Sequence, residues 1–181
     1  VTYLNAHNVN ITETESDYAD ILRRADILYA DGMSIVWAAK RLDPPRLPER
    51  VNAGDCFLEF CRACAGRNLS LYLLGSEPGV ARTCAGRITQ QVPGLRIAGA
   101  SDGFWRHGGQ FPDEQAVIDD IRTAHPDVLL LGLGVPLQER WADRHRAHLG
   151  VPVVWCVGAL FEYYAGRRAR APRWVRRIGL E

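Results

Sequence analysis

Residues 127–134 read DVLLLGLG, an apolar run without the alternating polar residues of a half-buried strand. A strand that is apolar on both sides must be covered on both faces, as is typical of parallel sheets. Similar apolar runs occur at residues 71–75 and 151–158. The chain is therefore expected to form a parallel sheet with helices on both faces.

Segments with helical periodicity separate these runs. We predict further strands at residues 26–31 and 95–100, and a strand followed by a turn in the first ten residues. Helices are predicted at residues 16–25, 32–42, 54–66, 78–92, 112–125 and 136–149. This alternation predicts an α/β fold, with a predominantly parallel, Rossmann-like sheet flanked by helices, in a single domain of residues 1–181.

Composition narrows the classes of function. The formal net charge of +1 provides no overall field that would attract nucleic acid, so no nucleic-acid partner is expected. The cysteine count is five, and an odd number in apolar surroundings favours free thiols in a reducing, cytoplasmic compartment. Cys61 and Cys64 have CxxC spacing without a second pair, which favours buried thiols over a metal or redox site.

Glycine-bearing motifs follow the predicted strands, at residues 31–32, 75–79, 101–105, 132–139 and 157–162. Ligands of open parallel sheets bind beyond the carboxyl ends of the strands, and helix N-termini there favour anions such as a nucleotide diphosphate. Alternatively, the glycines only make tight turns from strand to helix. The run GLGVPL lacks the third glycine of a dinucleotide fingerprint, which disfavours a nicotinamide-dependent oxidoreductase. The chain contains no DxD pair, which disfavours a metal-bridged sugar nucleotide.

Asp31 lies at the exit of the predicted strand 26–31. A carboxylate at this place could accept a proton as a general base. It could equally cap the helix that follows. The residue alone leaves both interpretations open.

Taken together, the motifs resemble the WecG/TagA/CpsF glycosyltransferase family, also called glycosyltransferase family 26. They run along the whole chain as ADG at residues 30–32, PERVNAGD at 48–55, LLGSEPGVA at 73–81, PDVLLLGLGVPLQE at 126–139 and VGALFEYYAG at 157–166. The resemblance implies an inverting, metal-independent transferase that needs no cofactor. Its substrates would be a UDP-sugar donor and a polyprenyl-diphosphate-linked sugar acceptor, in the synthesis of bacterial surface polysaccharides. Donors in the family include UDP-N-acetylmannosamine, its uronate and UDP-glucose.

The resemblance also implies roles for individual residues. Asp31 matches the catalytic base, and three matched residues would bind substrate: Asn5, Arg50 and Gln138. The glycines at strand ends would hold nucleotide and diphosphate: Gly75, Gly132, Gly134 and Gly158. Two of these residues also have plain structural interpretations, Arg50 as a surface arginine paired with Glu49 and Asn5 as a turn residue.

The chain departs from the family pattern at three positions. Leu137 replaces a lysine, so any role of that charge is absent here. Ala159 replaces a glycine and Glu162 replaces an aspartate. These two changes either shift the donor preference or have no effect on it.

Six of the eleven residues from 167 to 177 are arginine. We expect Arg167, Arg170 and Arg173 to contact the acceptor diphosphate or anionic lipid at the cytoplasmic face of the membrane. A solvated helix face is the alternative. The resemblance implies peripheral membrane association, self-association, and a C-terminal appendage that is missing after residue 181. A non-catalytic nucleotide-sugar-binding subunit is the rival function.

Overall fold

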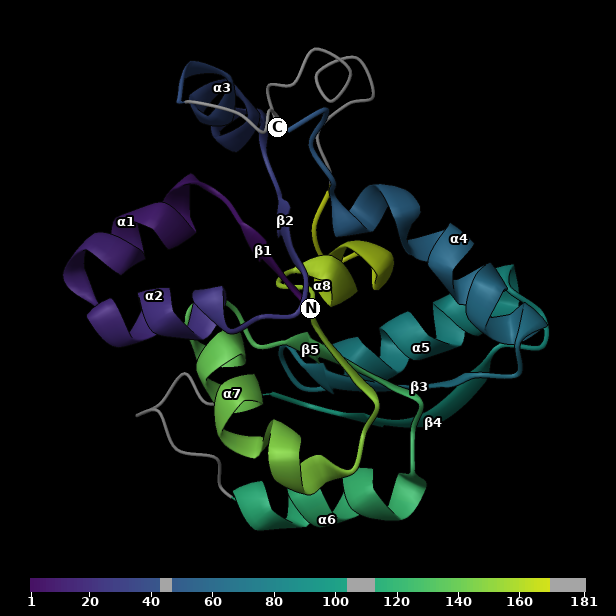
Figure 1. Cartoon of the computed structure of the whole chain (residues 1–181). Helices are drawn as coiled ribbons and strands as arrows, with labels where there is room; N and C mark the ends of the chain where they lie inside the picture. Colours follow the sequence, from purple (N-terminus) through teal and green to yellow (C-terminus); the bar gives the residue numbers. More distant parts are fainter. Residues whose placement is uncertain (43–46, 104–112, 170–181) are drawn as a thin grey trace.

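The computed structural model describes residues 1–42, 47–103 and 113–169 (Figure 1). Strands and helices alternate along the chain. In order, the elements are β1 (Thr2–Leu4), α1 (Ala6–Thr14), α2 (Ser16–Arg23), β2 (Leu28–Ala30), α3 (Met33–Arg41), α4 (Ala53–Gly66), β3 (Ser70–Gly75), α5 (Val80–Gln91), β4 (Arg96–Ser101), α6 (Glu114–Ala124), β5 (Val128–Gly132), α7 (Leu137–Leu149), β6 (Val153–Cys156) and α8 (Leu160–Tyr164).

Every strand pair is parallel. Four strands form one sheet in the order β4-β3-β5-β6, and β1 and β2 form a second, two-stranded sheet. Val1 joins the two sheets edge to edge, because its amino group donates to the Val154 carbonyl at 2.7 Å and its carbonyl accepts from the Cys156 amide at 3.0 Å. The carboxyl ends of the six strands in the described residues therefore lie at the same edge of the molecule.

The central strands β3 and β5 are buried on both faces, as their sequences predict. Leu71, Leu73 and Leu130 point into a core that α4, α5 and α8 complete. The alternate residues Leu74 and Leu129 point into a second core, formed with α6 and α7. Figure 1 shows these helix groups on opposite sides of the four-stranded sheet. The predicted α/β fold with a parallel sheet is confirmed.

One predicted element is wrong. Residues after β1 were expected to form a turn, but Asn5 begins helix α1. The Asn5 side chain accepts from the Asn8 amide at 3.0 Å, and the Asn8 side chain accepts from the Asn5 amide at 3.0 Å, which forms a reciprocal capping box. Apolar periodicity missed this helix because it has almost no amphipathic pattern and buries only Asn8.

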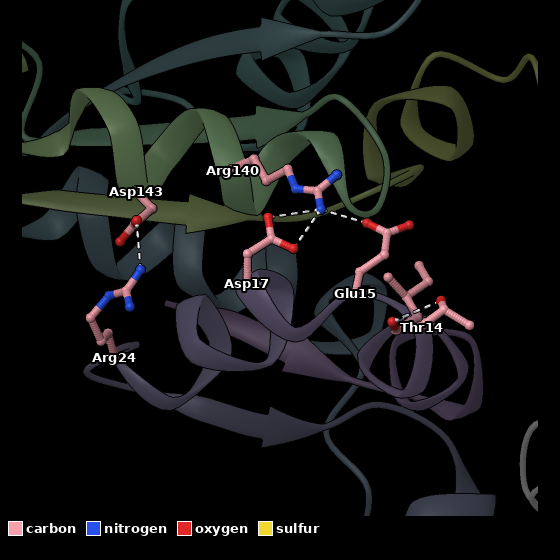
Figure 2. Close-up of polar contacts among 7 residues, drawn as sticks. Thr14, Glu15, Asp17, Arg24, Arg140 and Asp143 are labelled. Carbon is pink, nitrogen blue, oxygen red and sulfur yellow. Dashed lines mark hydrogen bonds and ion pairs between the residues drawn. The ribbon is translucent and has the colours of Figure 1, made fainter.

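Ion pairs connect α7 with the α1–α2 region (Figure 2). Arg140 of α7 contacts Asp17 at 2.9 Å and also contacts Glu15. Arg24 contacts Asp143 at 2.8 Å. Because these side chains are partly exposed, solvent screens the pairs and each contributes little to stability. Their main effect is to fix how α2 lies along α7.

Candidate active site

The motifs predicted to lie at strand ends meet at one edge of the molecule, because all the strands run parallel. Asp31 follows β2, Gly75 ends β3, Gly132 ends β5 and Val157 follows β6. In the backbone, Ser76 donates to the Gly132 carbonyl at 2.9 Å, and Val157 donates to the Leu131 carbonyl at 2.8 Å. The loops after β3, β5 and β6 are therefore held side by side at the edge where ligands of parallel sheets bind.

A cavity of about 170 Å³ contains Asp31 at this edge. Its walls come from the ends of β1 and β2, the start of α4, and the turn from β6 into α8. The lining residues are Tyr3, Tyr29, Asp31, Asn52, Ala53, Gly54, Val157, Ala159, Leu160 and Tyr163. The cavity thus combines one carboxylate with several aromatic side chains.

Asn52 fixes the orientation of the Asp31 carboxylate. The Asn52 amide nitrogen donates to Asp31 Oδ1 at 2.8 Å, while the Asn52 amide oxygen accepts from the Gly54 backbone at 3.0 Å as the N-cap of α4. One side chain therefore starts a helix and holds the carboxylate. Sequence reasoning missed Asn52, although an asparagine just before the helical run AGD is an N-cap signal.

Asp31 does not occupy the N-cap position of the helix that follows it. Gly32 occupies this position, with φ +113°. The Asp31 side chain accepts from Asn52 and lines the cavity. The role of Asp31 as a general base remains a prediction.

Tyrosines form the aromatic walls. Tyr3 and Tyr29 lie with ring centres 6.1 Å apart, and the Trp155 indole donates to the Tyr29 hydroxyl at 3.1 Å. Burial raises the pKa of both tyrosines above the usual value, so both hydroxyls remain protonated. The cavity therefore offers stacking surfaces and neutral hydroxyl groups, which suit a sugar or a nucleobase.

Arg50 lies close to this site in the chain but pairs with a different residue from the one expected. Its guanidinium contacts Asp55 at 3.4 Å rather than the expected Glu49, and its side chain is only 13% exposed. The Val51 amide donates to the Ala30 carbonyl at 2.8 Å, which aligns residues 50–52 with the end of β2. Arg50 is thus a largely buried cation beside the Asp31 segment, and its substrate contact remains a prediction.

Gln138, the expected substrate-binding amide, is completely buried. Its oxygen accepts from the Gly158 amide at 3.0 Å, and its nitrogen donates to Glu139 Oε1 at 2.7 Å and to the Tyr3 hydroxyl at 3.3 Å. Gly158 lies between two cavity-lining residues, and Tyr3 is itself a lining residue. The described contacts of Gln138 therefore position the cavity wall, and direct substrate binding remains a prediction.

The four predicted glycines differ in their surroundings. A Cβ on Gly75 would overlap the Gly132 backbone, and a Cβ on Gly132 would lie 2.8 Å from the Phe161 ring. A Cβ on Gly158 would lie 2.5 Å from the Tyr3 hydroxyl, whereas Gly134 has open space around it. Close packing explains the first three without any ligand, so nucleotide binding by these glycines remains a prediction.

Asn5 and Arg167 are not among the residues that line the cavity. Asn5 caps α1, as described above. Arg167 is exposed, while its neighbour Arg168 lies over the ring of the cavity residue Tyr163, 5.8 Å from its centre. Arg170 and Arg173 lie outside the described residues.

The departures from the family pattern have local explanations. Leu137 begins α7 and packs against the apolar core that α6 and α7 share, a place that suits leucine better than lysine. Ala159 has φ −77°, an ordinary value for alanine, so its methyl group lines the cavity without backbone strain. The Glu162 carboxylate contacts the Arg168 guanidinium at 3.9 Å.

Glu139 is a buried carboxylate next to the Gln138 amide. Burial raises its pKa, and hydrogen bonds from Gln138 and Thr2 only partly oppose this effect. Because the native state then binds the proton more tightly than the unfolded state, the stability that Glu139 contributes is fully present at acidic pH. It is lost as pH rises through the native pKa of Glu139.

We therefore expect Glu139→Gln to flatten the dependence of the free energy of unfolding on pH. The amide keeps an oxygen that can accept from Thr2 and Gln138, so the fold should survive. Urea unfolding at about pH 5 and about pH 8 measures the difference. Glu13→Gln, at an exposed position on α1, is the control. If Glu139→Gln kept the wild-type dependence of the free energy of unfolding on pH, the raised pKa of Glu139 would be contradicted.

The remaining features of the described chain point to no second chemical site. A larger cavity of about 550 Å³ lies between α2, α7, the start of β1 and β6. Burial raises the pKa of Cys61 to about 12, which fits the predicted unreactive thiol.

Within residues 1–42, 47–103 and 113–169, no three His, Cys, Asp or Glu side chains are grouped to hold a metal. No helix in these ranges is long and apolar enough to cross a bilayer.

Comparisons with known proteins agree with the motif pattern. A sequence model of the "Glycosyl transferase WecG/TagA/CpsF family" matches residues 1–181. The chain is 29% identical over 167 residues to N-acetylglucosaminyldiphosphoundecaprenol N-acetyl-beta-D-mannosaminyltransferase of Bacillus subtilis (strain 168), covering 92% of this chain and 62% of that protein. The enzyme of the same name from Staphylococcus aureus (strain NCTC 8325 / PS 47) is 27% identical over 177 residues, covering 98% and 67%. The chain thus spans about two thirds or less of these relatives.

One solved structure shows a weak similarity to this chain. A substrate-binding periplasmic protein from Ralstonia solanacearum aligns with a TM-score of 0.40 and 16% identity, covering 91% of this chain and 46% of that protein. A similarity this low carries no argument about fold or function.

Proposed function

The chain belongs to the WecG/TagA/CpsF family of glycosyltransferases, and from this membership we propose that it transfers a sugar from a UDP-sugar to a polyprenyl-diphosphate-linked saccharide. The relatives' names specify an N-acetylmannosaminyl group and an N-acetylglucosaminyl-diphosphoundecaprenol acceptor. We propose UDP-N-acetylmannosamine as the first donor to test, ahead of its uronate and UDP-glucose. The reaction would contribute to bacterial surface polysaccharides, at the inner face of the membrane.

The placement of Asp31 carries this proposal. A carboxylate at the end of β2, oriented by Asn52 at 2.8 Å inside a cavity, is arranged as a general base would be. Asp31 would accept the proton of the acceptor hydroxyl as that oxygen bonds to the anomeric carbon of the donor sugar. The bond from the anomeric carbon to the diphosphate oxygen breaks at the same time, and UDP leaves with the bonding electrons. Attack opposite the leaving group inverts the anomeric configuration.

Other residues would bind rather than react. The largely buried Arg50 would provide a charged fork for a diphosphate oxygen or a sugar hydroxyl. Tyr3, Tyr29 and Tyr163 would pack against the sugar or base. The arginines that follow α8 would balance the charge on the departing diphosphate, a role that requires no metal ion.

A donor panel tests the reaction class. The full-length protein is incubated with the three UDP-sugars and a short polyprenyl-diphosphate N-acetylglucosamine acceptor, with and without a chelator. We expect UDP release only when donor and acceptor are both present, unaffected by the chelator. UDP binding without release for any donor would support the rival function, a non-catalytic nucleotide-sugar-binding subunit. Release that the chelator abolishes would contradict metal independence.

A further inference from the structure

Helix α3 lies next to the candidate base yet packs poorly against the protein. It begins directly after Gly32, one residue beyond Asp31, and buries only Val36. Trp37 is 52% exposed, and Leu42, the C-cap that follows the helix, is 71% exposed. Figure 1 shows α3 beyond the end of β2, away from the four-stranded sheet. A tryptophan and a leucine this exposed beside a candidate active site suggest a contact surface.

The exposed side of α3 combines apolar and cationic residues. Ser34, Trp37, Ala38 and Arg41 recur at spacings of three and four residues, which places them on one face, and all four are exposed. Lys40 is also exposed, and residues 32–42 contain no Asp or Glu. The exposed residues of α3 and its C-cap thus include an aromatic ring, a leucine and two positive charges, and residues 32–42 contain no negative charge.

These properties match the surface of an anionic bilayer. Tryptophan prefers the boundary between lipid head groups and acyl chains. Lysine and arginine contribute about 1 kcal/mol each near anionic lipid, while their aliphatic stems cover apolar surface. A short amphipathic helix with this composition is typical of proteins that lie on a membrane without crossing it.

We propose that the exposed face of α3 docks the protein on an anionic membrane surface, with Trp37 and Leu42 inserted and with Lys40 and Arg41 at the head groups. The proposal rests on the proposed function, because a lipid-linked acceptor requires the catalytic carboxylate to lie near the bilayer. It assigns the membrane contact to a helix other than the arginine-rich segment at the end of the chain.

The dimensions of α3 fit this role. Its nine residues span about 14 Å, since an α-helix rises about 1.5 Å per residue. Asp31 precedes the first turn of α3, so docking through Trp37 and the last turn would hold Asp31 within about that distance of the lipid. The head group of a diphosphate-linked sugar, which projects from the same surface, would then reach the cavity without leaving the membrane.

Vesicle binding tests the proposal without any sugar substrate. The full-length protein is mixed with vesicles of phosphatidylcholine alone, or of phosphatidylcholine with a third phosphatidylglycerol, and the bound fraction is measured by flotation. We expect binding to the anionic vesicles that weakens with added salt. The double variant Trp37→Ser, Leu42→Ser is expected to bind at least about tenfold more weakly. Lys40→Gln with Arg41→Gln should lose mainly the preference for anionic vesicles.

Matched controls replace the same types of side chain, apolar and cationic, at other exposed positions. Ile27→Ser removes an apolar side chain that is 55% exposed at the opposite end of β2. Arg62→Gln with Arg122→Gln removes two exposed charges from α4 and α6. Both controls should bind vesicles as the wild type does. Thermal unfolding of all variants should match the wild type, because every replaced side chain is exposed.

Several results would overturn the proposal. One is a wild type that does not bind anionic vesicles, and another is an α3 variant that binds as well as its control. A third is a wild type whose self-association is lost in the Trp37→Ser, Leu42→Ser variant while vesicle binding is unchanged, which would assign the face to a second copy. Sugar transfer to a detergent-solubilised acceptor separates the docking proposal from the proposed function. Transfer without docking overturns only the α3 proposal, and docking without transfer overturns only the proposed function.

Discussion

Asp31→Asn is expected to lower kcat for sugar transfer by about 10²–10⁴-fold, the usual contribution of a general base. The asparagine cannot accept the acceptor proton, but its Oδ1 can still accept the hydrogen bond from Asn52. The fold, and the affinity for UDP, should therefore be nearly unchanged. Steady-state kinetics with the preferred donor, together with UDP titration, separate the loss of kcat from any loss of binding.

Asp26→Asn is the matched control for this experiment. Asp26 is exposed and precedes the amino end of β2, whereas Asp31 follows its carboxyl end. The control should keep wild-type kcat and KM. If Asp31→Asn were as active as Asp26→Asn, Asp31 would not be the base, although the reaction class would stand.

The second large effect concerns folding rather than chemistry. Gly75→Ala is expected to destabilise the protein by about 2–6 kcal/mol, combining strain at a disfavoured backbone angle with overlap in a packed core. Gly75 has φ +143°, and a Cβ there would meet the backbone carbon and oxygen of Gly132. Because β3 and β5 are the central strands, the overlap cannot be relieved at an edge. Urea unfolding measures the loss.

Gly134→Ala is the control for Gly75→Ala. Gly134 has φ +80°, and no atom lies within 4 Å of the position that its Cβ would take. Only the backbone strain remains, about 1–2 kcal/mol. A Gly75→Ala protein that is as stable as Gly134→Ala but fails to bind UDP would show that Gly75 serves the nucleotide rather than the packing.

The fold was largely predictable because a strand that is buried on both faces has an uninterrupted apolar sequence. Leu71 to Leu74 and Leu129 to Leu131 are apolar at every position, since alternate residues enter different cores. Helix α1 has no comparable apolar pattern. It is specified by the reciprocal hydrogen bonds of Asn5 and Asn8 and has almost no apolar face. Periodicity therefore predicts elements that build the core better than elements that only cap its edge.

The site was predictable only in part. The position of Asp31 after a strand, together with the parallel sheet, was enough to place a carboxylate at the ligand-binding edge. The partners of Gln138 could not be read in advance, because Gly158 and Tyr3 are distant in the sequence and adjacent only in the fold. The sequence does not distinguish a buried glutamine from an exposed one. Asn52 was missed for a different reason, since an N-cap signal indicates a contact with the following helix and does not indicate the contact with Asp31.

The most direct test of the central claim is the formation of a disaccharide on a lipid diphosphate. The full-length protein is given UDP-N-acetylmannosamine and a polyprenyl-diphosphate N-acetylglucosamine, and the product is identified by mass spectrometry and its anomeric configuration by NMR. The account predicts a product with inverted configuration for the wild type, and none above background in the same time for Asp31→Asn. A product with retained configuration, or equal amounts from both proteins, would contradict direct transfer with Asp31 as the base.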